Sequence, residues 1–394
     1  MAVSHVPVAG IIACGDRDLS DVTSLVELFA LVRDPRKRRG VRHRCAAVLT
    51  LMVLAVLCGA GNFRQAADRV AEMPQAFLAA AGARAHPVLG VRLTPSRDTI
   101  RRLVEAIDAP AVDLLVCRWM AARLIPDGGR LGVGLAVDGK TVRNSGGGAS
   151  PDAKLFSAMR HDTAVVIGQV QVPADTTEVT QIEALLGPIQ VAGMVVTADA
   201  AHPNRDTAEY LTGRGADYVF TVKGNKPSLL AAIWNRVPTA TADTATHVEE
   251  EHRNGMIIRR WMWTADADGV DFPAAAQVFR LRRDTYNLSG QRISKEIIHG
   301  ITSLSADDAT AGQLAGYVRE HWGIENKIHW VRDVLFAEDH QHAYTGHAAH
   351  GMALLRNLAL GLIRLAGHTK IKQVLERNHG NKTLIPALLK ASRP

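Results

Sequence analysis

The spacing of apolar positions in the first 128 residues is that of helices. Apolar side chains recur at helical intervals over four segments, 25–32, 45–58, 62–81 and 97–125. The second of these is almost wholly apolar, whereas the others alternate apolar and polar faces. The pattern therefore predicts an all-helical first domain over residues 1–128.

Beyond residue 128 the pattern changes to short apolar runs, which are typical of strands. These runs cover 131–137, 154–160, 164–172, 194–198 and 217–223. Helical patterns fall between the later runs, at 177–186, 204–214 and 226–236. Short polar turns join the first three runs and indicate antiparallel pairing. This order predicts a mixed α/β sheet with helices on its faces.

A second change follows at residue 237. Strand-like runs at 247–253, 256–264, 277–284 and 293–304 predict a β-rich insertion over 237–304, with a hairpin at Asn254-Gly255. Helical patterning resumes at Ser305 and runs through Leu365. We therefore expect a core made of 129–236 and 305–366, interrupted by the insertion and closed by a basic tail over 367–394.

Composition and charge narrow the class of protein. With 47% apolar and 22% charged residues in 394, the chain has the composition of a soluble globular protein. Its net charge of +7 favours a polyanionic partner. Residues 33–44 hold seven Arg or Lys against one Asp. The charge density of this segment predicts DNA contacts, for which the candidates are Arg36, Lys37, Arg38, Arg39 and Arg42.

Two features bear on the compartment. The apolar run 45–61 is shorter than the ~20 residues that span a bilayer, so it predicts a buried helix and no membrane association. The four cysteines form no Cys-x-x-Cys pair, which favours reduced thiols over a zinc site. We expect a cytoplasmic protein, associated with the nucleoid if its partner is DNA.

Three acidic residues carry the chemistry that the sequence suggests. Asp138 and Asp199 each close an apolar strand-like run, and Glu325 lies in a later helical segment. Taken singly, each is ordinary turn or surface chemistry. Taken together, two strand-end carboxylates and one helical carboxylate can hold a pair of divalent cations for phosphodiester chemistry. This is the site plan of a ribonuclease H-like fold.

Five segments give the sequence a family resemblance. In chain order they are Asp34–His43, Ala136–Thr141, Val196–Ala200, Asp217–Asn225 and His321–Trp330 continued by Asp333–Asp339. In these segments the chain resembles bacterial insertion-sequence DDE transposases, of the group that includes the H-repeat-associated proteins. The resemblance covers about 300 residues and is most specific in the last segment.

The resemblance implies a catalytic triad of Asp138, Asp199 and Glu325 that binds two Mg²⁺ or Mn²⁺ ions. The implied fold is a ribonuclease H-like core with a β-rich insertion before the glutamate, preceded by a helical DNA-binding domain. The implied reaction is hydrolysis at transposon ends and attack of the freed 3′-OH on target DNA. DNA is then the partner, bound by a homodimer or higher oligomer.

The chain departs from the wider superfamily around its glutamate. His321 stands where an arginine is expected and Arg332 where a lysine is expected. Both fall on the side of Glu325 in a regular helix, so both are candidate phosphate contacts. Lys140, Lys223 and Lys226 are further candidates, although a plain strand-to-helix turn explains 223–226 equally well. Trp322 and Trp330 are expected to anchor the core.

Two other functions remain open at this point. A related nuclease would hydrolyse DNA without joining strands, and a degenerate copy would bind DNA without catalysis. The intact set of three carboxylates argues against the degenerate copy. The altered basic positions are the feature that keeps it open.

Overall fold

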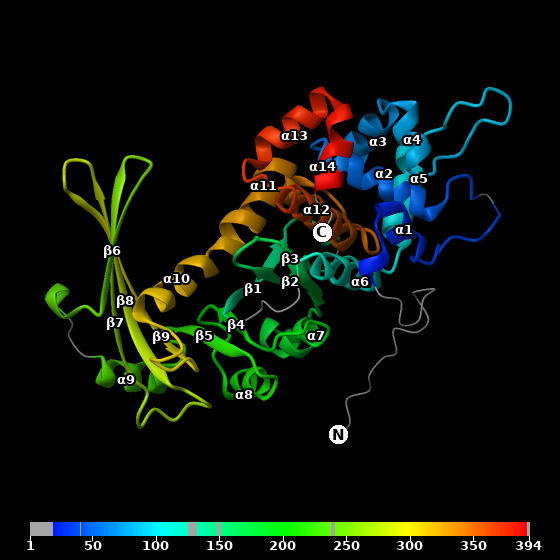
Figure 1. Ribbon diagram of the computed structural model, residues 1–394. Helices are drawn as coiled ribbons and strands as arrows, with labels where there is room; N and C mark the ends of the chain where they lie inside the picture. The colour runs from blue at the N-terminus through cyan, green and yellow to red at the C-terminus, as the bar shows by residue number, and fades with distance from the viewer. Residues whose placement is uncertain (1–18, 40, 125–131, 148–150, 238–240, 392–394) are drawn as a thin grey trace, which may run out of the picture.

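Figure 1 shows the computed structural model of the chain. The structure describes residues 19–39, 41–124, 132–147, 151–237 and 241–391. The boundary expected at 128/129 lies outside these residues. The insertion strands lie at one end of the molecule and the N-terminal helices at the other, with the expected core between them (Figure 1).

The described strands form one nine-stranded sheet in the order β3-β2-β1-β4-β5-β9-β8-β7-β6. The half that precedes the insertion contains β1 (Val133–Val142), β2 (Ala153–Arg160), β3 (Val166–Val172), β4 (Met194–Ala198) and β5 (Asp217–Val222). As predicted, β1, β2 and β3 pair antiparallel. Strands β4 and β5 run parallel to β1, so the sheet is mixed and its centre is apolar on both faces.

The insertion extends the same sheet instead of forming a separate one. Its strands are β6 (His247–Arg253), β7 (Met256–Asp266), β8 (Gln277–Asn287) and β9 (Arg292–Thr302). Strand β9 pairs antiparallel with β5, so that Thr302 lies opposite Val219. The hairpin predicted at Asn254-Gly255 is present, with φ of 51° and 72° at these two residues. Positive φ at both positions matches the right-handed twist of the flanking strands.

The described part of the first domain is built from helices, as the pattern predicts. They are α1 (Leu25–Ala30), α2 (Cys45–Leu57), α3 (Phe63–Ala71), α4 (Gln75–Ala80), α5 (Arg97–Ala106) and α6 (Ala109–Ala122). Helix α2 is buried on all sides apart from Ala46, and packs against α1, α3 and α12 (Ala348–Leu365). No helix among the described residues combines the length and the apolarity needed to cross a bilayer. The thiols of Cys45, Cys58 and Cys117 are free and buried.

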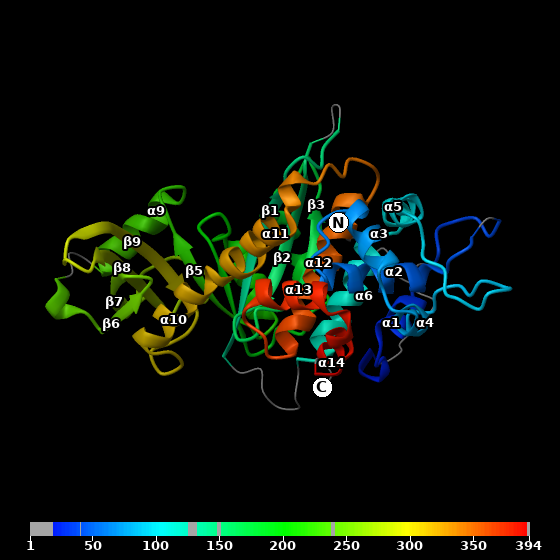
Figure 2. The ribbon, with the colours of Figure 1, turned by 90° about the horizontal axis from the view of Figure 1, so that it is seen from above.

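Helices cover both faces of the sheet beside β1. On one face lie α10 (Ala311–His321), the π-helical turn η5 (Glu325–His329), α11 (Trp330–Phe336) and α12. The other face carries η3 (Glu178–Gln181), α7 (Ile182–Leu186) and α8 (Arg205–Gly213), while α9 (Pro227–Arg236) packs on β8 and β9. Seen from above, α10, η5 and α11 run as one rod across the sheet toward the N-terminal helices (Figure 2).

The helical segment predicted from Ser305 differs in detail. The Ser305 hydroxyl donates to Asp308 at 2.6 Å and closes a turn, so α10 begins only at Ala311, behind a Thr310–Gln313 capping box. A left-handed residue, Ala337 (φ 49°), ends α11, and α12 starts afresh at Ala348. The helical patterning expected from Ser305 through Leu365 is therefore divided among α10, η5, α11 and α12.

The basic tail expected over 367–394 contains helices among its described residues. Residues Ile371–Gly380 form α13 and Ile385–Ala391 form α14. Helix α13 packs against α2 and α12, and α14 packs against α12. The Asn378 amide donates to the Leu57 carbonyl at the end of α2, at 3.0 Å. Val374 and Leu375 are buried in this contact. The apolar residues of α13 recur at helical spacing, but the basic residues between them obscure this pattern in the sequence.

Candidate active site

Strand pairing brings Asp138 and Asp199 side by side. Val137 of β1 lies opposite Ala198 of the parallel strand β4, and each aspartate is the next residue. Paired positions share a face of the sheet. Asp138 is not at a strand end as predicted, because β1 continues to Val142 along its antiparallel partner β2. It is β4 that ends here, and its end leaves the space into which both carboxylates project.

Glu325 is delivered to the same place by an irregularity in its helix. Residues Glu325–His329 form a single π-helical turn between α10 and α11. Such turns insert one extra residue per turn and are frequent at functional sites. Here the turn sets His329 against Glu325, with Nδ1 3.0 Å from Oε2, and 3.6 Å from the Asp138 Oδ2. Ligand atoms of Asp138, Glu325 and His329 all lie within 4.8 Å of one another.

Asp199 flanks this cluster without belonging to it. Its Oδ1 accepts from the backbone N–H of Ala201 at 3.0 Å and lies 3.8 Å from His202 Nε2. The side chain is 42% exposed, compared with 25% for Asp138 and 56% for Glu325. The three predicted carboxylates therefore line one open surface, with Asp138 at its floor.

The electrostatics of the cluster favour a cation. Burial raises the pKa of Asp138 to about 6, opposed by His329 and reinforced by the charges of Asp199 and Glu178. The hydrogen bond from His329 lowers the pKa of Glu325. Burial and the neighbouring carboxylates disfavour the ionised form of Asp138. A bound cation would stabilise that ionised form.

The donor set fits a divalent metal of the hard class. Carboxylate oxygens are the ligands that Mg²⁺ and Mn²⁺ prefer, and Asp138 and Glu325 present them within 4.8 Å. The His329 Nδ1 lies between the two carboxylates, at the place where positive charge is needed. Its Nε2 is buried without a partner. Asp138 and Glu325 are the residues that would hold a divalent metal here.

Lys140, a predicted DNA contact, is buried in an ion pair. Two residues after Asp138 on β1, it shares the face covered by α11 and is only 8% exposed. Its ammonium lies 2.7 Å from Asp333 Oδ2 and 3.4 Å from Asp339 Oδ1. The structure thus places Lys140 in ion pairs with two carboxylates and not at an exposed position where DNA was expected to meet it. Its charge instead lowers the pKa of the neighbouring Glu325.

The two altered positions of the glutamate helix are buried as well. Arg332 has no exposure and its guanidinium is bound by Glu338. His321 is 6% exposed, its Nδ1 lies 3.1 Å from Thr197 Oγ1, and burial lowers its pKa to about 4. It is therefore neutral. Neither side chain is exposed where a phosphate was expected to meet it, because the packing of α10 and α11 turns both into the protein.

The basic segment is divided in its roles. Arg36 is pinned inside its own loop, where it donates to Asp34 at 2.7 Å and to the His43 carbonyl at 2.7 Å. The remaining candidates in this segment are exposed: Lys37, Arg38, Arg39 and Arg42. The structure thus leaves four of the five predicted side chains free to meet a polyanion.

The 223–226 turn adjoins the site. Lys223 is exposed, and Lys226 is partly buried at the start of α9. Between them, the Asn225 amide donates to the Ala200 carbonyl at 2.6 Å, which ties this turn to the loop that carries Asp199. Lys223 therefore stands at the edge of the acidic surface.

Sequence reasoning missed several residues of the site. His329 and His202 follow acidic residues at spacings of four and three, which is the signal that was available. Glu178 gave no signal, because it comes from a separate segment after β3. Trp322 and Trp330 were expected in the core but are 41% and 53% exposed on either side of Glu325.

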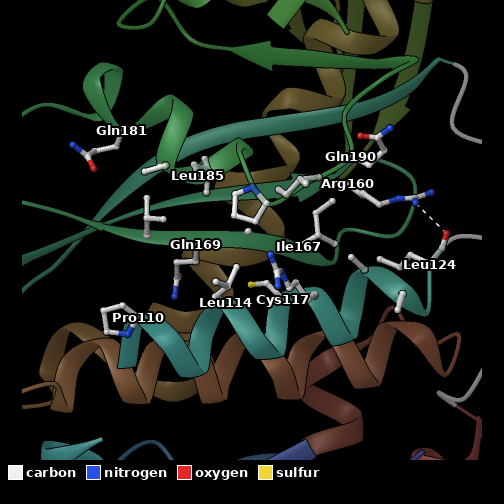
Figure 3. Close-up of a pocket in the computed structure, with 18 of the residues that line it drawn as sticks. Pro110, Leu114, Cys117, Leu124, Arg160, Ile167, Gln169, Gln181, Leu185 and Gln190 are labelled. Carbon is white, nitrogen blue, oxygen red and sulfur yellow. Dashed lines mark hydrogen bonds between the residues drawn. The ribbon is translucent and has the colours of Figure 1, made fainter. Parts of the chain in front are cut away.

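A mainly apolar pocket of about 510 Å³ lies elsewhere, along the edge strand β3 between α6 and α7. Figure 3 shows Leu114, Ile167 and Leu185 lining it, with Arg160 donating to the Leu124 carbonyl at one end at 3.0 Å. Strand β2 separates this edge from β1. The pocket is thus apart from the carboxylates, and the candidate chemistry belongs to the open acidic surface.

Comparison with known proteins assigns most of the chain to two family models. The "Transposase DDE domain" family matches residues 129–362, and a "DDE_Tnp_1-associated" domain matches residues 26–120. The putative transposase YncI of Escherichia coli O157:H7 is 28% identical over 360 residues, covering 87% of this chain and 88% of that protein. The H repeat-associated putative transposase YhhI of E. coli K12 is 26% identical over 362 residues, covering 87% and 91%.

Among solved structures, the piggyBac transposase synaptic complex with hairpin DNA aligns at a TM-score of 0.42 and 9% identity, over 97% of this chain and 78% of that one. The family match alone covers more than half of the chain, with Asp138, Asp199 and Glu325 inside it. The chain belongs to the DDE transposase family.

Proposed function

We propose that Asp138, Asp199 and Glu325 are the catalytic carboxylates of a DNA transposase that cuts at transposon ends and joins the 3′-OH ends to target DNA. The observation that carries the proposal is that Asp138 and Glu325 lie in one cluster, while strand pairing places Asp199 beside Asp138. Their open setting suits a duplex polymer, because small-molecule sites are usually enclosed.

The finer fold assignment belongs to the same proposal. Strands β1, β2 and β3 form an antiparallel meander, and β4 and β5 continue the sheet parallel to β1. We infer a ribonuclease H-like core, in which the first and fourth strands carry the two aspartates. The helical domain, the interrupted core and the β-rich insertion remain the proposed division of the chain.

The proposed cofactor is a pair of Mg²⁺ or Mn²⁺ ions held by the three carboxylates. Bound metal would supply Lewis-acid activation of the attacking oxygen and stabilisation of the leaving 3′ oxygen. The chain itself contributes the fixed spacing of Asp138 and Asp199. It also contributes His329, which holds the Glu325 carboxylate toward Asp138 through its Nδ1.

The proposed path of DNA crosses the acidic surface between two basic sets. One is the exposed side chains Lys37, Arg38, Arg39 and Arg42 on the helical domain, and the other is Lys223 beside the Asp199 loop. Phosphate contacts of this kind position a duplex without reading its sequence. Binding to two transposon ends would require a homodimer or higher oligomer.

A labelled duplex with a transposon end tests the proposal against its closest alternative. Incubation with Mg²⁺ and a target duplex should give both cleaved ends and joined products. A nuclease without strand transfer would give cleaved ends alone, and a degenerate copy would bind the duplex and cut nothing. A pre-cut donor that carries a 3′-OH separates a defect in joining from a defect in cutting.

A further inference from the structure

We propose that Glu178 and His202 are positioning residues that hold the Asp199 carboxylate in place for metal. The inference rests on the proposed function, because it concerns one of the three proposed ligands. Neither residue lies among the carboxylates that the family resemblance implies. Both come from the face of the sheet opposite Glu325, on segments that precede and follow β4.

Contacts other than the one with Asp199 set the position of the His202 ring. It is 1% exposed, and its ring stacks on Phe156 with 5.2 Å between ring centroids and an angle of 6°. Its backbone N–H donates to the Asp199 carbonyl at 3.1 Å, which folds the chain back at the end of β4. The turn and the stacking together leave the imidazole one location, beside the carboxylate of Asp199.

The imidazole lies between two carboxylates. Its Nε2 is 3.2 Å from Glu178 Oε2 and 3.8 Å from Asp199 Oδ1. Neither ring nitrogen makes an aligned hydrogen bond. A buried imidazole without one is costly, so a small rotation that brings Nε2–H onto a carboxylate is favoured. If the carboxylate of Asp199 turns toward His202 and accepts a hydrogen bond from Nε2, the Asp199 side chain is held in one position. Without that bond it is 42% exposed.

The position of Glu178 is also restricted. Its side chain is 14% exposed, and its Oε1 lies 2.7 Å from the Nζ of Lys154. It lies against Gly139, the residue after Asp138, so closely that a Cβ at that position would be 1.8 Å from Oε1. Gly139 pairs with Phe156, so the glycine, the stacked ring and the glutamate share one face. The sequence leaves room for this carboxylate only by having no side chain at 139.

The arrangement is that of an outer shell behind a metal ligand. Histidines and carboxylates that orient ligands typically contribute 10–100-fold to metal affinity or activity. Lys154 and Glu178 set the position of His202, and His202 limits the positions of Asp199. A role confined to packing η3 against the loop after β4 would leave the metal dependence of the protein unchanged.

The test compares His202→Ala, His202→Gln and Glu178→Gln with wild type in full-length protein. Binding of Mn²⁺ alone is measured by the loss of the free-ion electron paramagnetic resonance signal. Cleavage of a transposon-end duplex is measured against Mn²⁺ concentration at saturating DNA. We expect His202→Ala to raise the Mn²⁺ concentration for half-saturation about 10–100-fold in both assays, and His202→Gln, which keeps a side-chain donor, to recover part of it.

The controls separate this inference from its foundation. His299→Gln alters another buried histidine, on β9 beneath α9, and should leave Mn²⁺ binding at the wild-type value. Asp199→Asn should abolish cleavage; if it does not, the proposed triad fails. Unchanged Mn²⁺ half-saturation in both His202→Ala and Glu178→Gln, with Asp199→Asn inactive, overturns the positioning role alone. Should His202→Ala fail to fold, Glu178→Gln decides, because it keeps the shape of the side chain and removes the charge that faces His202.

Discussion

Arg332 and Glu338 form a bidentate ion pair from which solvent is wholly excluded. Nε lies 2.5 Å from Oε2 and Nη2 lies 2.6 Å from Oε1, and neither side chain has any exposure. Arg356 of α12 brings a second guanidinium to the same carboxylate at 3.1 Å, and donates to the Gly61 carbonyl at 2.7 Å. The group ties α11 to α12 and to the turn between α2 and α3.

Arg332 should therefore matter to stability and not to phosphate binding. Removing one partner of a buried pair leaves an uncompensated charge and typically costs 3–5 kcal/mol. We expect Arg332→Met to lower the free energy of unfolding by about that amount in urea titrations. The double change Arg332→Met with Glu338→Leu should recover part of the loss. Equal stability of wild type and Arg332→Met, with weakened DNA binding, would return Arg332 to its predicted role.

The three carboxylates should be separable from DNA binding. Asp138→Asn and Glu325→Gln keep the shape of each side chain but remove the charge that binds metal. Each is expected to reduce cleavage by at least about 10³-fold, while the dissociation constant for a transposon-end duplex changes less than about threefold. Gel shift in EDTA measures the binding and a nicking assay in Mg²⁺ the cleavage. Full cleavage by either variant would remove that residue from the triad.

Positions that follow a strand are easier to predict from sequence than the side chains that end up exposed. Asp138 and Asp199 each follow an apolar run, and the pairing of those runs as β1 and β4 places the two residues side by side. Whether Lys140 or Arg332 faces DNA depends on partners such as Asp333 and Glu338 and on how α11 lies over the sheet. The π-turn at Glu325 shifts the helix face, and no 3.6-residue periodicity reports it.

The positions of Glu178 and His202 could not be predicted from the sequence pattern, because they depend on long-range packing. Glu178 lies against Gly139 of β1, and the ring of His202 stacks on Phe156 of β2. Each residue alone is an ordinary polar residue in a loop or short helix. Their proximity exists only after β1, β2 and β4 have paired.

Acid should destabilise the protein through His321. Burial lowers the pKa of this histidine to about 4, below the value of about 6.5 in an unfolded chain. Since the folded state disfavours the proton, its stabilising contribution is complete above pH 6.5 and is lost as pH falls toward 4. A difference of this size corresponds to about 3 kcal/mol. His321→Gln should flatten the decline in melting temperature between pH 6.5 and 4.

The matched control for this prediction is His379→Gln. His379 is exposed near the end of α13, so its removal should leave the pH profile of the melting temperature unchanged. If His321→Gln keeps the wild-type profile as well, the acid sensitivity arises elsewhere. Glu338, whose pKa is about 2 because two guanidiniums outweigh its burial, would affect only the range below about pH 4.5.

The exposed arginines of the basic segment should control the salt dependence of DNA binding. Each phosphate contact contributes about −0.9 to the slope of log K against log salt concentration. The double change Arg38→Gln with Arg39→Gln should therefore make the slope shallower by up to about 2. Arg36→Gln is the matched comparison, because Arg36 is held by Asp34 and the His43 carbonyl. It should destabilise its loop and leave the slope nearly unchanged.

Substitution of Gly139 tests whether the position of Glu178 on one face of β1 affects metal binding by the carboxylates on the other face. A methyl group at this position would lie 1.8 Å from Glu178 Oε1 and 2.3 Å from its Cδ, so the carboxylate must move. Gly139→Ala should thus displace Glu178 from His202 and raise the Mn²⁺ concentration for half-maximal cleavage. In the double change Gly139→Ala with Glu178→Ala the clash is gone, so thermal stability should recover. Metal affinity should stay low, because the support of His202 is still missing. Recovery of both stability and metal affinity in the double variant would show that the contact serves packing alone.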